Sequence, residues 1–159
     1  MNAIGAIIVA SFAVFWVGAG AHQFPGRWFV SVFGLSFLIS AAIVLAATRI
    51  PFGRNSAGFD GKLYGIFVTL EAVAIICAVV LLRRAGKKEF VIPVIALIVG
   101  LHFFGMVPAL HSNEFWWVGG AMCALSILTM SVLPRRIWAP VTGIGCALIL
   151  WLSAIRAFF

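Results

Sequence analysis

Two ionisable residues interrupt long apolar stretches of this chain, and their side chains are the ones that could carry chemistry. Glu71 lies inside the stretch 63–82 and His102 inside the stretch 90–110. If both stretches lie in lipid, a charged carboxylate there costs about 2.5–3.5 kcal/mol on insertion scales. Protonation or a partner offsets this cost, and residues of this kind are typical of proton or ion routes through membranes.

The turn between the two stretches predicts that both residues lie at one depth. Gly86 is the expected tip of this turn, with Glu71 15 residues before it and His102 16 residues after it. At 1.5 Å per residue, each lies about 22–24 Å along its helix from the turn. The rotation of the helices decides whether the side chains face each other. The alternative is structural, with each group hydrogen-bonded across helices and holding the bundle together.

Met106 and Pro108 are further candidates for a pathway through the protein. Met106 follows His102 by four residues and therefore lies on the same helical face. An imidazole and a thioether could bind a soft metal such as Cu(I), but a packed methionine is favoured because no Met-rich or Cys/His cluster accompanies them. Pro108 removes one backbone hydrogen bond and could free a carbonyl towards a cavity, or it could simply kink the helix end.

The sequence contains no motif of a familiar catalyst or cofactor site. GxSxG, HExxH and a phosphate-binding Gly-Lys loop do not occur. Haem is not expected, since two axial histidines must face each other and His102 has no histidine at its depth. Asp60 is expected to be a turn residue. Cys77, Cys123 and Cys146 lie in apolar stretches and are expected to be buried small hydrophobes. We therefore predict no cofactor, no metal and no catalytic residue.

The composition predicts an all-α membrane protein. Of the 159 residues 64% are hydrophobic and only 9% are charged, too few to cover a water-facing surface. Helices of about 20 apolar residues cross the hydrocarbon layer, whereas barrel strands are about half as long and alternate in polarity. We expect one transmembrane domain over residues 1–159, a bundle of about six helices with short loops. The expected helices cover about 2–21, 28–48, 63–82, 90–110, 115–133 and 138–155.

The placement of the basic residues predicts the topology. The net charge is +7, but ten of the eleven Lys and Arg residues flank apolar stretches, a pattern of membrane anchors and not of nucleic-acid binding. Of all eleven Lys and Arg residues, seven fall on one side of a six-helix bundle and four on the other. Since the more basic side of a membrane protein faces the cytoplasm, this count favours both termini outside the cell membrane, in particular a bacterial inner membrane. Arg49, Arg54 and Lys62, on the less basic side, could contact lipid headgroups.

Three functions fit these observations. The first is a small transporter or channel, with Glu71 and His102 as a proton- or ion-responsive site and a homo-oligomer to complete a pathway. The second is a non-catalytic subunit or scaffold that docks a partner protein or lipid, as part of a larger membrane complex. The third is an intramembrane enzyme acting on a lipid or quinone. It has the least support, because one carboxyl group and one imidazole form only a fragment of a catalytic site.

Overall fold

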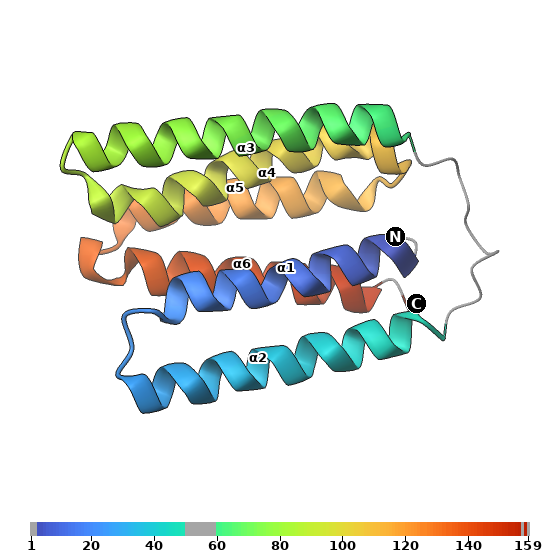
Figure 1. Ribbon diagram of the computed structural model, residues 1–159, viewed down its shortest axis with the longest axis horizontal. Helices are drawn as coiled ribbons and strands as arrows, with labels where there is room; N and C mark the ends of the chain where they lie inside the picture. Colours follow the sequence, from blue (N-terminus) through green and yellow to red (C-terminus); the bar gives the residue numbers. More distant parts are fainter. Residues whose placement is uncertain (1–2, 50–59, 157, 159) are drawn as a thin grey trace.

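The described residues of the protein form a bundle of six α-helices. The computed structural model describes residues 3–49, 60–156 and 158. Its helices are α1 Ala3–Ala21, α2 Gly26–Ala47, α3 Gly61–Arg84, α4 Val91–Leu110, α5 Glu114–Val132 and α6 Trp138–Arg156. Short 3-10 helices, η1 Lys88–Phe90 and η2 Arg135–Ile137, precede α4 and α6. Figure 1 shows the six helices running along one long axis, with α1 beginning and α6 ending at the same end. The predicted helical bundle is confirmed.

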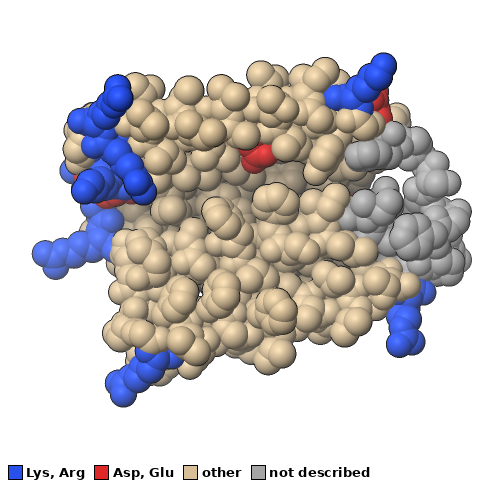
Figure 2. Space-filling model, in the orientation of Figure 1, with Lys and Arg blue, Asp and Glu red and all other residues tan. Residues whose placement is uncertain are grey.

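The lengths and apolar surfaces of the helices are those of a membrane protein. Five of the described helices are long and apolar enough to cross a membrane, and α1 contributes a shorter apolar helix, Gly5–Ala21. Large apolar side chains face outward along the bundle, for example Leu38 and Leu81. On the face shown in Figure 2 the Lys and Arg side chains gather at the two ends of the molecule, and none is visible between the ends. The chain is therefore a helical membrane bundle.

The helices divide into an inner group and two outer helices. In the inner group α1 packs extensively on α6, α4 packs on α5, and α6 joins the two pairs. The outer helix α2 contacts mainly α1, and the outer helix α3 contacts mainly α4 (Figure 1). None of the residues of α3, all of which the structure describes, is fully buried. The helix that carries Glu71 is thus held on one side only.

Glycine and serine contacts hold the first, second and sixth helices together. A methyl group added to Gly143 of α6 would lie about 2.5 Å from the Cα of Gly20 on α1, so the two backbones touch. The Ser40 hydroxyl donates to the Ala10 carbonyl at 2.7 Å, and the Trp151 indole N–H donates to the Ser40 hydroxyl at 2.9 Å. Small residues and interhelical hydrogen bonds therefore set these helix positions.

Pairs of small residues four positions apart occur in several of the helices. Only some of these pairs lie where one helix packs against another. Ser36 and Ser40 are buried, and so are Gly143 and Ala147. Gly120 differs, because a methyl group added there would meet none of the described atoms within 4 Å. The spacing of Gly120 and Ala124 makes a close approach of helices plausible without assigning a contact, and Gly120 makes none with the described residues. Spacing alone does not distinguish a face turned to lipid from a face turned to a helix, since both surroundings are apolar.

Two helices begin two residues earlier than predicted. The third helix begins at Gly61 and not at Leu63, because the Asp60 carboxylate accepts hydrogen bonds from the backbone N–H groups of Lys62 and Leu63, both at 3.0 Å. The second helix begins at Gly26, directly after Pro25, and not at Trp28. The polar residues at these ends belong to the first turns of the helices. A prediction that takes each helix to be an apolar stretch leaves such residues out.

The contact between Gly20 and Gly143 predicts opposite effects of two alanine substitutions. Gly143→Ala forces the α1 and α6 backbones apart and is expected to destabilise the protein by about 1–3 kcal/mol. Gly120→Ala enters open space and is expected to be neutral or to stabilise by up to about 1 kcal/mol, because alanine favours the helix. Unfolding of the detergent-solubilised variants, followed by circular dichroism, measures both. Equal effects of the two substitutions would rule out a backbone contact at Gly143.

Candidate functional site

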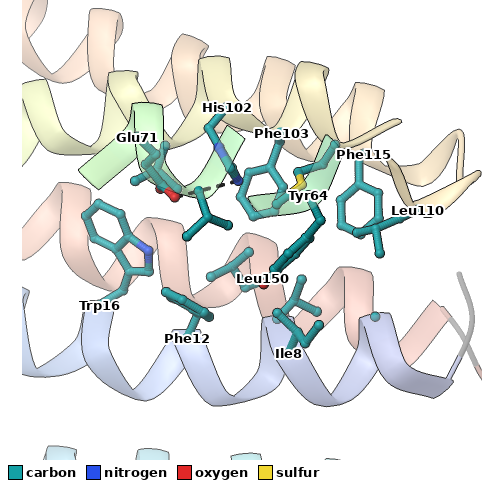
Figure 3. Close-up of a pocket in the computed structure, with 15 residues that line it drawn as sticks. Ile8, Phe12, Trp16, Tyr64, Glu71, His102, Phe103, Leu110, Phe115 and Leu150 are labelled. Carbon is teal, nitrogen blue, oxygen red and sulfur yellow. Dashed lines mark ion pairs between the residues drawn. The ribbon is translucent and has the colours of Figure 1, made fainter. Parts of the chain in front are cut away.

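Glu71 and His102 lie side by side halfway along the bundle. The Oε2 atom of Glu71 on α3 is 3.6 Å from the Nε2 atom of His102 on α4, and the two side chains are 15% and 8% exposed (Figure 3). The separation is within the range of an ion pair but is longer than a direct hydrogen bond. The common depth agrees with the prediction from the turn, where Gly86 adopts a left-handed φ of 72°.

Contacts with Phe67 fix the position of the imidazole. The His102 ring meets the ring of Phe67, one turn before Glu71 on α3, edge-on with centroids 6.4 Å apart. Gly105 of α4 leaves room for this ring, because a methyl group added to Gly105 would overlap it. The packing of α3 on α4 therefore holds His102 against the carboxylate of Glu71.

The pair borders a cavity of about 80 Å³, enough for two or three waters at about 30 Å³ each. Its lining comes mainly from α1, α3 and α4 and is mostly apolar. Figure 3 shows Glu71 and His102 on one wall, with Phe12 and Trp16 of α1 opposite and Tyr64 further along the cavity. The two ionisable groups consequently face a small space and are not sealed in a packed core.

This space opens to the side of the bundle, between α1 and α3. These two helices barely touch in the described part of the chain. Figure 2 shows a hollow on this face, with acidic atoms visible halfway along it. Phe12, at the rim, is 53% exposed. Molecules dissolved in the lipid layer can therefore approach the pair without crossing the ends of the protein.

The other candidate residues lie in different places. Met106 is buried and lines the cavity with His102. Pro108 lies inside α4 on an exposed face and is not part of the lining. Arg49 is exposed just after the end of α2, Lys62 is exposed in the first turn of α3, and Arg54 lies outside the described residues. The structure thus brings Met106 to the pair and leaves Pro108 and the basic residues away from it.

The expectation of buried cysteines was wrong for Cys77. Cys146 is buried and Cys123 is partly buried, but Cys77 is exposed on α3. An outer helix that faces lipid is as apolar as a helix inside the core, so an apolar stretch does not show which of its residues are buried.

Residues of α1 and Tyr64 were missed in the sequence. Tyr64, Val68 and Glu71 follow one another at intervals of four and three residues, which puts them on one face of α3. This spacing is a signal that could have identified Tyr64, the one tyrosine of the sequence. Trp16 and Phe12 carry no such signal, since the position of α1 opposite α3 depends on its packing against α6.

Neither a protein-family model nor a curated protein nor a solved structure matches the chain. Among the described residues, no group of three or more His, Cys, Asp or Glu side chains could hold a metal ion. Chemically, the carboxyl group and the imidazole can share or exchange a proton, or together respond to a cation in the cavity. The 3.6 Å separation of these two groups and the cavity beside them are the observations that bear on the function of the protein.

The proximity of the two groups predicts that their effects on stability are not additive. We expect Glu71→Gln and His102→Gln to show a coupling energy of about 0.5 kcal/mol or more in a double-mutant cycle measured by unfolding in detergent. Glu89→Gln with His102→Gln is the matched control, because Glu89 lies 13 residues before His102, about 20 Å along the chain's helical path. Coupling no larger than in this control would contradict the pairing.

Proposed function

We propose that the protein is a small membrane transporter whose proton- or ion-responsive site is the pair Glu71 and His102. The supporting observation is that the two groups lie 3.6 Å apart and border a cavity in the middle of the bundle. A buried carboxyl group that only held helices together would have no need of this space. Intramembrane ionisable groups that face a cavity are characteristic of proton and ion routes.

A change of protonation at Glu71 would alter the cavity. Loss of the proton places a negative charge on an otherwise apolar wall, where water or a cation is needed to offset it. Gain of the proton removes that charge and favours the dry, closed arrangement. Because α1 and α3 make few contacts, the gap between them is the part of the bundle that can widen at low cost. Protonation would thus be coupled to opening of this gap.

The lining favours cations that carry apolar groups. A carboxylate attracts the charge, and the faces of Trp16, Tyr64 and Phe103 offer cation–π contacts and apolar surface. Entry from the lipid layer through the lateral opening suits such molecules. A small alkylammonium ion is the chemical class that this combination of groups would accept.

The wider setting follows from the charges at the two ends. We place the end with more Lys and Arg in the cytoplasm, with both termini outside, in a bacterial inner membrane. Six helices enclose only a narrow interior, so a homo-oligomer would complete a continuous pathway. Membrane lipids would surround the remaining apolar surface.

A non-catalytic subunit is the second candidate, and α3 supports it. This helix has no fully buried residue along its described length, so its outer face is open to a partner helix of a larger membrane complex. Reproducible association with such a complex, without flux from the purified protein, would favour this alternative over a transporter.

Flux through liposomes tests the proposal. Purified protein is reconstituted with a pH-sensitive dye inside, and proton flux is recorded with and without a gradient of tetramethylammonium. We expect Glu71→Gln to reduce the flux by about tenfold or more, because the neutral amide cannot exchange the proton. His102→Gln is expected to lower it as well.

Glu89→Gln serves as the control, since Glu89 lies in η1, before α4, and pairs with Arg135 at 3.2 Å, away from the cavity beside Glu71. This variant should retain wild-type flux. Wild-type flux that persists unchanged in Glu71→Gln would contradict a role for the pair in transport.

A further inference from the structure

A second cavity lies at the more basic end of the bundle. It has a volume of about 480 Å³ and is lined by the turn after α1, the last turn of α3, and the short helices η1 and η2 with the first turns of α4 and α6. These segments come from four separate parts of the chain. The cavity is distinct from the space beside Glu71, with which it shares no lining residue.

Basic side chains converge on this cavity from three elements. Arg83 comes from α3, Lys88 from η1 and Arg135 from η2, and Glu89 is the one carboxylate among its described lining residues. Counting Lys, Arg, Asp and Glu alone, three cations and one carboxylate give a formal charge of +2. The excess is local, because other basic residues of the same end do not line the cavity. These are Arg27, Arg84, Lys87 and Arg136.

Aromatic rings hold one of these cations in place. The Arg135 guanidinium carbon lies 5.6 Å from the centre of the Phe90 ring and 5.9 Å from that of Trp138. The two rings meet edge-on with centroids 4.8 Å apart. Since the two rings already position the side chain, less conformational entropy is lost when Arg135 binds an anion.

The cavity also offers apolar surface at the depth of the headgroups. Val91, Ile92 and Ala139 contribute to its lining. Arg83 follows Glu71 by 12 residues on one helix, about 18 Å, whereas half the hydrocarbon layer is about 15 Å thick. With Glu71 near the middle of the membrane, the cavity therefore lies at the boundary between hydrocarbon and headgroups.

We propose that this cavity binds one anionic phospholipid. The phosphate lies between Arg83, Lys88 and Arg135, and the glycerol and upper acyl carbons contact Val91 and Ile92. A phospholipid fits better than a free anion, because the same cavity pairs cations with apolar surface at headgroup depth. Basic pockets between membrane helices are known to favour such headgroups. The site does not depend on the transport role of Glu71.

Native mass spectrometry of the detergent-solubilised protein tests this site. Phosphatidylglycerol and phosphatidylcholine with identical acyl chains are titrated in parallel, and we expect phosphatidylglycerol to bind about fivefold more tightly or better. The double variant with Arg83→Gln and Arg135→Gln should weaken phosphatidylglycerol binding by about 25-fold, at about fivefold for each cation. Arg84→Gln with Arg136→Gln removes equal charge from the same end and should leave binding nearly unchanged.

A third variant changes the charge in the opposite direction. Glu89→Gln removes the competing carboxylate and should tighten phosphatidylglycerol binding, which keeps the test decisive if the double arginine variant fails to fold. Equal loss in both double variants would overturn the proposal, since it would show only a diffuse charge effect. Displacement of the lipid by millimolar inorganic phosphate would also overturn it, because the site would then accept a free anion.

Discussion

The cost of keeping a carboxyl group inside an apolar layer is the constraint on which the rest of the structure depends. Glu71 occupies the middle of a helix that contacts the bundle on one side only, so lipid faces the remainder of that helix. The carboxyl group turns inward to His102, and a small cavity lies beside it. Packing against α4 covers most of the carboxyl group, which is 15% exposed, and the cavity offers room for water. Both features lower the cost that the hydrocarbon imposes.

The packing of the helices leaves this cavity at the least tightly held place in the bundle. Backbone contact between Gly20 and Gly143 fixes α1 on α6, and the hydroxyl of Ser126 on α5 donates to the Pro93 carbonyl of α4 at 2.5 Å. Each of these pairs is closely packed. The seam between α1 and α3 lacks comparable contacts. A bundle with firm pairs and one loose seam can change shape at the seam while its pairs stay intact.

Much of the fold could be predicted from the sequence, but only part of the site. Apolar stretches of about 20 residues identify the helices, since lipid requires that length and an internally bonded backbone. The short turn at Gly86 makes the depths of Glu71 and His102 comparable. Rotation about each helix axis is not encoded in apolar stretches, because lipid and core are equally apolar. For this reason the exposure of Cys77 and the role of Trp16 were not predicted.

The basic cavity illustrates a second limit. Counting Lys and Arg residues in loops distinguishes the two ends of the bundle, but it treats Arg83 and Arg84 alike. Helix rotation and the short helices η1 and η2 decide that Arg83 lines the cavity and that Arg84 does not. Neighbouring charges in one turn therefore have different surroundings.

The central claim is that Glu71 is accessible from the lipid layer through the gap between α1 and α3. Its most direct test is labelling of the folded protein in liposomes with dicyclohexylcarbodiimide, an apolar reagent that modifies carboxyl groups, followed by peptide mass spectrometry. We predict that Glu71 is modified in preference to Glu89 and Glu114, which lie at helix ends. Absence of modification at Glu71, while the unfolded protein reacts there, would contradict the claim.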